Sequence, residues 1–199
     1  MNNRERNDLL ISWLTISLAF AWVFSSFNLL GALAGTDLAS LGFISLLPIA
    51  LIVTGTGFVF HEMAHRAIAK RFGCHAEFRM WPYSLLLMLA LALGLGVVFA
   101  APGAVYIYGE NISRRQNGLI SVSGPATNIA VGIAFLLLLL VSGNGFIALA
   151  SMIGFQINLW LAFFNLLPVA PLDGSKVFAW NTAVWALMFI PLALVLFVL

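Results

Sequence analysis

The chain has 199 residues, of which 62% are hydrophobic and 8% are charged, and its formal net charge is +2. Its mean hydropathy of +1.06 excludes an ordinary soluble domain, because the apolar residues stand in long uncharged runs that predict membrane-spanning helices. These runs do not alternate apolar with polar residues, which excludes a transmembrane barrel. The small net charge argues against a nucleic-acid partner.

The N-terminal third of the chain predicts two long helices. Residues 1–8 are polar and are expected at the surface. Residues 13–34 are uncharged, long enough to cross a bilayer and without a small-residue cleavage site, so we predict a retained helix and not a signal peptide. After a turn at 35–37, the uncharged run 38–60 continues as a helix to Gly73, a residue suited to end it.

The rest of the chain alternates apolar runs with short polar breaks. Residues 74–82 carry charge, Trp81 and Pro82, which is typical of a membrane interface. Residues 84–101 are apolar, and the segment AAPGAVYIYG at 100–109 is β-branched and aromatic, which favours a strand or loop. The remaining elements are a polar segment at 110–118, a helix at 119–141 that SGPATN opens with Pro125 near its first turn, a turn at 142–145, a helix at 146–167, a break at 171–176 and a last apolar run at 177–199.

The nine lysines and arginines predict the topology. If 84–101 crossed the membrane once, Arg114, Arg115 and Lys176 would lie on the opposite side from the others. If the segment enters and returns, all lie on one side, which the positive-inside rule makes cytoplasmic. We therefore predict an all-α polytopic membrane protein with five transmembrane helices and a re-entrant hairpin with short β-strands at 84–108. Residues 1–199 are expected to form one integral domain of the cell membrane, with a cytoplasmic N-terminus.

The sequence HEMAH at 61–65 carries the candidate chemistry. His61 and His65 are four residues apart, so on a helix they share one face and can bind one metal ion. Glu62 lies about 100° round the helix from His61, close enough to hold a water molecule and take its proton. Catalytic zinc takes three protein ligands, so a third ligand besides His61 and His65 remains to be identified.

Asp173 is the third ligand by elimination. The chain has seven acids, five of which fall at expected surface positions: Glu5, Asp8, Asp37, Glu77 and Glu110. Only Glu62 and Asp173 remain at membrane depth, where ionisable groups are costly and are therefore functional candidates. His61 precedes Arg71 by ten residues, or about 15 Å of helix. If Arg71 marks the cytoplasmic boundary, the metal site lies inside the bilayer, and we expect the site to open towards the cytoplasm.

Plainer interpretations of the polar residues stay open. Glu62 and Arg66 are four residues apart and could simply form an intrahelical ion pair. Cys74 and His75 are expected to be structural. For Gln156 and Asn158 the preferred role is interhelical hydrogen bonding. For Asn128 and Asn165 the same role is an open alternative.

Three segments together resemble the site-2 proteases, a family of intramembrane zinc metalloproteases, over residues 43–176. HEMAH followed by AKRFG resembles the family's HExxH helix and its basic, glycine-ended exit from the membrane. SGPATN resembles the motif that opens the next core helix. NLLPVAPLDG resembles the motif Asn-x-x-Pro…Asp-Gly.

The resemblance implies one zinc ion per chain with three ligands: His61, His65 and Asp173. It implies Glu62 as general base, Asn165 as a polar helper near the substrate backbone, and Gly124 and Pro125 as residues that shape helix packing. It also implies a transmembrane protein substrate within the lipid bilayer, received in extended form by the segment AAPGAVYIYG.

The leading hypothesis is therefore an intramembrane zinc endopeptidase. A membrane zinc peptidase of the CAAX-processing type takes a glutamate on a downstream helix as third ligand, but besides Asp173 the acids downstream of HEMAH are the interfacial Glu77 and Glu110. A non-catalytic membrane scaffold or small transporter would use the polar pocket for binding alone. The intact HEMAH sequence and Asp173 argue against a degenerate protease.

Overall fold

The computed structural model describes residues 1–26, 42–98, 101–109 and 111–198. This part of the chain is mostly helical and contains a two-stranded sheet, in agreement with the predicted helical class. The turn predicted at 35–37 lies outside the described residues, as do two of the acids assigned to the surface, Asp37 and Glu110.

Contacts between residues divide the chain into two compact units. Unit 1 comprises Met1–Val59 and Glu77–Tyr106, and unit 2 comprises Phe60–Ala76 and Ile107–Leu199. The single domain expected over 1–199 stays a prediction.

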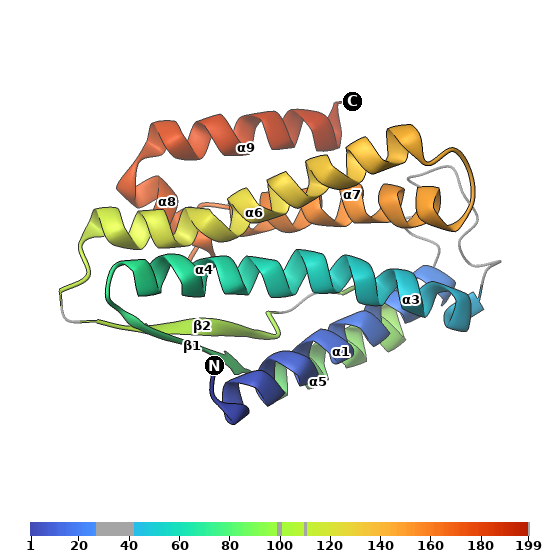
Figure 1. The fold of residues 1–199 in the computed structure, drawn as a ribbon, viewed down its shortest axis with the longest axis horizontal. Coiled ribbons are helices and arrows are strands. Elements are labelled where there is room, and N and C mark those ends of the chain that lie inside the picture. The colour runs from blue at the N-terminus through green and yellow to red at the C-terminus, as the bar shows by residue number, and fades with distance from the viewer. Residues whose placement is uncertain (27–41, 99–100, 110, 199) are drawn as a thin grey trace. The chain divides into compact units, whose positions relative to one another are not determined.

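In unit 1, helix α1 packs against α3 and α5 (Figure 1). The helical elements of this unit are α1 (Asn3–Ser26), α3 (Gly42–Thr54), the π-helical turn η2 (Gly55–Val59) and α5 (Pro82–Leu95). Polar groups join α1 to α3: Ser17 Oγ lies 2.6 Å from Thr54 Oγ1, and Trp13 Nε1 donates to the carbonyl of Leu51 at 3.0 Å. These hydrogen bonds satisfy buried polar atoms between otherwise apolar helices.

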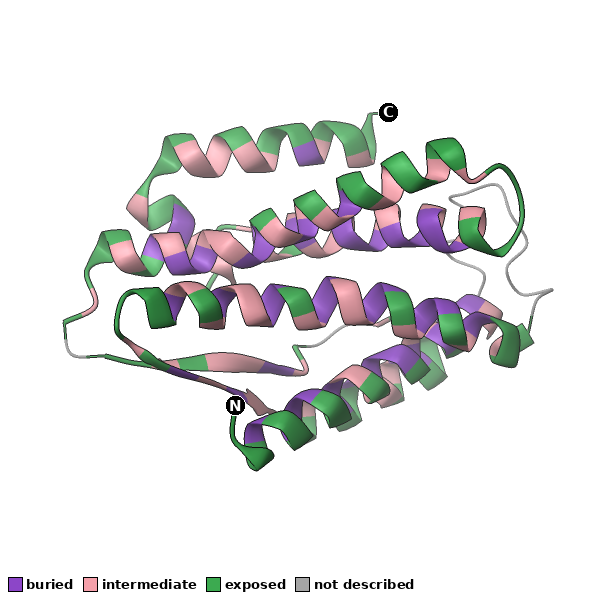
Figure 2. Ribbon diagram, viewed as in Figure 1, coloured by how far each residue is buried: buried purple, intermediate pink, exposed green. Residues whose placement is uncertain are grey.

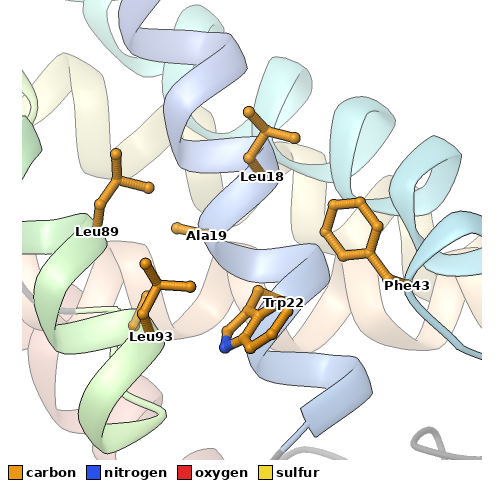
Figure 3. A pocket seen from close by; sticks show the side chains of 7 residues that line it. Leu18, Ala19, Trp22, Phe43, Leu89 and Leu93 are labelled. Atoms are coloured by element: carbon orange, nitrogen blue, oxygen red, sulfur yellow. The ribbon is translucent and has the colours of Figure 1, made fainter.

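A cavity of about 150 Å³ lies between α1, α3 and α5 (Figure 3). Its lining is apolar: Leu18, Ala19, Trp22, Phe43, Leu89, Ala92 and Leu93. Because none of these side chains can ligate a metal ion or exchange a proton, the candidate chemistry of the chain lies elsewhere.

Two residues of the polar N-terminal segment, Glu5 and Asp8, are buried in unit 1, so the surface position predicted for 1–8 is wrong for these two. Helix α1 begins at Asn3, and the side chain of Asn2 accepts a hydrogen bond from the backbone of Glu5 at 2.7 Å. Glu5 Oε1 in turn accepts from the backbone nitrogen of Phe78 at 3.2 Å. These acids are buried because they satisfy donors of a neighbouring strand, which local composition does not reveal.

Two short strands form the sheet: β1 (His75–Met80) and β2 (Gly103–Tyr108). The strand favoured in AAPGAVYIYG is confirmed as β2, whereas the segment 74–82, expected only as an interface, supplies β1. A β-carbon on Gly103 would lie 2.3 Å from the carbonyl oxygen of Arg79, so glycine is needed for this close approach. Helix α5 occupies much of 84–101, and the re-entrant depth of 84–108 stays a prediction.

Unit 2 is built around α6, which packs against α4, α7 and α8. Its helices are α4 (Phe60–Arg71), α6 (Arg114–Val141), α7 (Phe146–Asn165), α8 (Asp173–Trp180) and α9 (Thr182–Phe197). Figure 2 shows buried residues concentrated along the parts of α4, α6 and α7 that face other helices. Helix α9 stacks on α7 through the rings of Phe163 and Phe189, whose centroids are 5.0 Å apart.

Helix α6 begins at Arg114, so the predicted start at 119 and the predicted place of Pro125 in the first turn are both wrong. Ser113 forms a capping box with Gln116: the serine side chain accepts from the Gln116 backbone at 3.2 Å, and the glutamine side chain accepts from the Ser113 backbone at 2.9 Å. The pattern Ser-x-x-Gln was therefore the signal for this start. Pro125 lies inside the helix and is buried.

Four helices of the described chain are long and apolar enough to cross a membrane, which indicates a membrane protein: Asn3–Ser25, Gly42–Arg71, Arg114–Val141 and Phe146–Asn165. The predicted count of five is not confirmed. The last apolar run divides at Asn181, whose side chain accepts from the backbone nitrogens of Ala183 and Val184 and so starts α9. Helix α9 then has only 16 residues, fewer than the roughly 20 that span a bilayer.

Candidate metal centre

Two imidazoles of α4 form the base of the candidate site. His61 and His65 are both buried, one helical turn apart, and their Nε2 atoms lie 3.0 Å from each other. The helix presents them together because residues four apart share one face.

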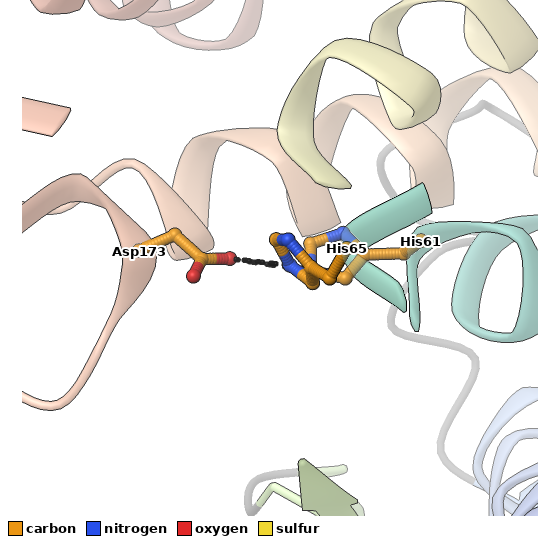
Figure 4. A group of neighbouring side chains, drawn as sticks. All are labelled: His61, His65 and Asp173. Atoms are coloured by element: carbon orange, nitrogen blue, oxygen red, sulfur yellow. Dashed lines mark hydrogen bonds and ion pairs between the residues drawn. The ribbon is translucent and has the colours of Figure 1, made fainter. Parts of the chain in front are cut away.

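Asp173 completes the cluster from a distant part of the chain. Its Oδ2 lies 3.3 Å from His61 Nε2 and 3.0 Å from His65 Nε2. Figure 4 shows this carboxylate pointing at the two rings. The structure therefore brings together the three residues that the sequence selected as ligands, all of them within unit 2.

The approach of α8 to the end of α7 places Asp173. Asp173 is the first residue of α8 and is followed by Gly174. A β-carbon on Gly174 would lie 2.1 Å from the carbonyl oxygen of Leu166, so only glycine permits this turn. Trp185 Nε1 donates to the same oxygen at 2.7 Å, which holds α9 to the same point.

The geometry of the cluster fits a zinc ion. Ligands about 2.0–2.1 Å from a tetrahedral zinc are separated from one another by roughly 3.3 Å. The three separations observed are 3.0, 3.0 and 3.3 Å. Two imidazole nitrogens and one carboxylate oxygen are also a donor set that zinc accepts in hydrolytic sites. The residues present can therefore hold this ion.

The second nitrogen of each imidazole has its own hydrogen-bond partner. His65 Nδ1 lies 2.7 Å from the carbonyl oxygen of Ile120, and His61 Nδ1 lies 2.6 Å from Asn128 Oδ1. Both partners are on α6. A partner at Nδ1 orients the ring and leaves Nε2 for a metal ion, as is usual for metal-binding histidines.

Helix α6 passes directly over the cluster at Gly124. A β-carbon at this position would lie 2.4 Å from His65 Nε2 and 2.6 Å from His61 Nε2. The sequence predicted a packing role for Gly124, but it did not predict that the residue adjoins the atoms that would bind the metal. Its hydrogen keeps that volume open.

Lys176 contacts the carboxylate of Asp173 from the other side. Its Nζ lies 3.6 Å from Oδ1, the oxygen that does not face the histidines. The two oxygens of this aspartate therefore have different partners. No feature of the sequence singled out Lys176 for this contact.

The two residues predicted to act on the substrate occupy different surroundings. Glu62 is buried in the first turn of α4, directly after His61. Asn165 is the last residue of α7, and its Nδ2 donates to the carbonyl of Leu161 in its own helix at 2.9 Å. Within the described chain, no hydrogen bond joins Asn165 to the three candidate ligands. The roles of both residues stay predictions.

The interhelical role preferred for Asn158 is confirmed. Asn158 Oδ1 accepts from Asn128 Nδ2 at 3.1 Å, which links α7 to α6. The sequence left the role of Asn128 open, and the structure shows that it contacts both Asn158 and His61.

The fold and the cluster define a helical membrane protein with a candidate metal centre on an HExxH helix. The chain is 40% identical over 192 residues to "Putative zinc metalloprotease MJ0611" of Methanocaldococcus jannaschii, covering 96% of this chain and 92% of that protein. It therefore belongs to the same family of zinc metalloproteases.

Two further relatives carry names of the same form. YwhC of Bacillus subtilis is 30% identical over 155 residues, which are 67% of this chain and 69% of YwhC. Rip3 of Mycobacterium tuberculosis is 29% identical over 122 residues, which are 59% of this chain and 26% of Rip3. No protein-family model and no solved structure matches the chain.

Proposed function

We propose that this metalloprotease is of the site-2 type, an intramembrane zinc endopeptidase that cleaves transmembrane segments of other membrane proteins. The observation that carries the proposal is the position of Asp173 Oδ2 within 3.3 Å of both imidazoles. The His61–His65 helix belongs to the apolar run Gly42–Arg71, which is long enough to cross a membrane. A hydrolytic centre on such a helix acts on peptide bonds at membrane depth.

The chemistry follows from the residues around the cluster. Zinc, when bound, lowers the pKa of a water molecule to about 7 and polarises the scissile carbonyl. Glu62 takes the proton from the attacking water and returns it to the nitrogen of the leaving amine. His61, His65 and Asp173 would hold the ion, and the burial of both histidines excludes bulk water from the reaction.

Asn165 has a conditional role in this scheme. To assist at the substrate carbonyl, its Nδ2 must leave the carbonyl of Leu161, to which it donates. Its place at the end of α7, eight residues before Asp173, puts it on the segment that delivers the third ligand. We assign it to the substrate backbone on the basis of the resemblance to site-2 proteases.

The substrate is expected to be a transmembrane helix that unwinds before cleavage. A helical amide is inaccessible because its backbone groups are already paired within the helix. Strand β2 offers a backbone edge to which an extended segment could add. Substrates with helix-breaking residues near the scissile bond are therefore favoured.

Zinc analysis of the purified chain tests the metal centre. We expect about one zinc ion per chain, since three ligands form a single site. His65→Ala should lose the ion, and Asp173→Asn should bind it more weakly because a neutral amide replaces the carboxylate. A cleavage-competent preparation free of zinc, or unchanged occupancy in Asp173→Asn, contradicts the assignment.

Cysteine labelling tests the proposed orientation. Arg115 is exposed at the start of α6, and we place it in the cytoplasm together with the N-terminus and the opening of the site. In Cys74→Ser, Arg115→Cys should react with a membrane-impermeant maleimide only after the cells are opened. Labelling of intact cells would instead place α6 in the reverse orientation and exclude a re-entrant 84–108.

A further inference from the structure

A chain of two buried amides leads away from His61, across α6 to α7. Asn128 Oδ1 lies 2.6 Å from His61 Nδ1, and Asn128 Nδ2 lies 3.1 Å from Asn158 Oδ1. Asn158 Nδ2 then lies 2.9 Å from the carbonyl oxygen of Gly154. Both asparagines are fully buried, at 0% exposure. Buried amides are costly unless they are hydrogen-bonded, so a chain of this kind is held in place by its own partners.

The direction of this chain follows from its last member. A backbone carbonyl can only accept, so Asn158 must turn its NH₂ group towards Gly154 and its oxygen towards Asn128. Asn128 must then donate to that oxygen with its own NH₂ group. Its remaining oxygen faces His61, and because this oxygen only accepts, His61 Nδ1 must carry the proton.

The tautomer matters because the other nitrogen faces the cluster. With the proton on Nδ1, His61 Nε2 has a free lone pair directed towards Asp173 and His65. If Asn128 were reversed, its NH₂ group would face Nδ1 and favour the tautomer with the proton on Nε2. That tautomer cannot bind a metal ion through Nε2.

We propose that Asn128 is a positioning residue that fixes His61 in its metal-binding tautomer, and that Asn158 and the carbonyl of Gly154 set the direction of Asn128. The inference rests on the proposed function, because it concerns the ligand role of His61. His65 needs no such device, since its Nδ1 faces a backbone carbonyl directly. The two ligands therefore differ in how their tautomers are determined.

The test compares variants of the full chain purified in detergent. Asn128→Leu removes the acceptor at His61 and should weaken zinc binding about 10- to 100-fold, the usual cost of losing such a partner. Asn128→Asp keeps an acceptor at His61 and should bind zinc more tightly than Asn128→Leu. Ser151→Ala is the control: this buried hydroxyl on α7 has no hydrogen-bond partner in the described chain, and its removal should change nothing. Affinity is measured by competition with a chelator.

Histidine nitrogen NMR supplies a readout that a merely structural role would not change. The chain has three histidines, so a His75→Gln background leaves two rings to assign. In the zinc-free protein we expect the proton of His61 on Nδ1, and loss of this tautomer preference in Asn128→Leu; zinc bound at Nε2 would itself fix the proton on Nδ1 and hide the difference. Should Asn128→Leu fail to fold, Asn158→Leu, which removes the member that directs Asn128, should show the same change more weakly.

The outcomes separate the two proposals. A wild-type chain that binds no zinc overturns the proposed metal centre and this inference with it. A wild-type chain that binds zinc, with unchanged affinity and unchanged His61 spectrum in both leucine variants, overturns only the role of the asparagines.

Discussion

Replacing Glu62 with glutamine should abolish cleavage of a transmembrane substrate while leaving zinc bound. Glutamine keeps the size of the side chain but cannot accept the proton of the attacking water, and loss of such a general base costs about 10²- to 10⁴-fold in rate. The three ligands, and therefore the zinc content, are untouched. The measurement is single-turnover cleavage of a reconstituted substrate, with zinc determined on the same sample.

Asp173→Asn provides the opposite pattern as a control, because it should weaken zinc binding and cleavage together. Cleavage by Glu62→Gln at the wild-type rate would remove Glu62 from its assigned role. Loss of zinc in Glu62→Gln would show instead that Glu62 supports the metal site itself.

Replacing Gly124 with alanine should empty the metal site. The added β-carbon would lie 2.4 Å from His65 Nε2 and 2.6 Å from His61 Nε2, about 1 Å inside ordinary contact. A buried helix cannot absorb such an overlap without displacing the ligands. Because a misplacement of about 1 Å can cost on the order of 100-fold in activity, we expect both zinc binding and cleavage to be lost.

Two other glycines provide matched controls for this variant. At Gly132, also on α6, a β-carbon meets the end of the flexible Leu159 side chain at 2.5 Å, so Gly132→Ala tests packing of α6 without touching the site. At Gly94 a β-carbon meets nothing within 4 Å, so Gly94→Ala should be silent. Gly124→Ala that binds zinc as tightly as Gly132→Ala contradicts the expectation.

The ligand set could be predicted because chemistry-bearing residues are scarce in this chain. The spacing of His61 and His65 places them on one helix face wherever that helix lies. Asp173 emerged because so few acids stand within apolar sequence. Because candidate ligands are so few, residues far apart in the sequence could be assigned to one site without knowing which segments contact each other.

The same reasoning failed where a polar residue has a distant partner. Glu5 and Asp8 were expected at the surface, yet both are buried in unit 1. Glu5 accepts a hydrogen bond from the backbone nitrogen of Phe78, on a strand 73 residues away. No local sequence pattern predicts that hydrogen bond. The start of α6 is a different case, because Ser113 and Gln116 form a recognisable capping box that hydropathy alone obscured.

The unequal partners of the Asp173 carboxylate bear on what kind of zinc site this chain builds. An aspartate can chelate an ion with both oxygens, and a fourth donor atom would close the coordination sphere. Because Oδ1 is paired with the ammonium of Lys176 at 3.6 Å, Asp173 would offer a bound ion one oxygen, Oδ2. If Asp173 supplied both oxygens, four protein atoms would surround the ion. If it supplies one, three protein atoms do so, and the fourth position stays open for an exchangeable molecule such as water.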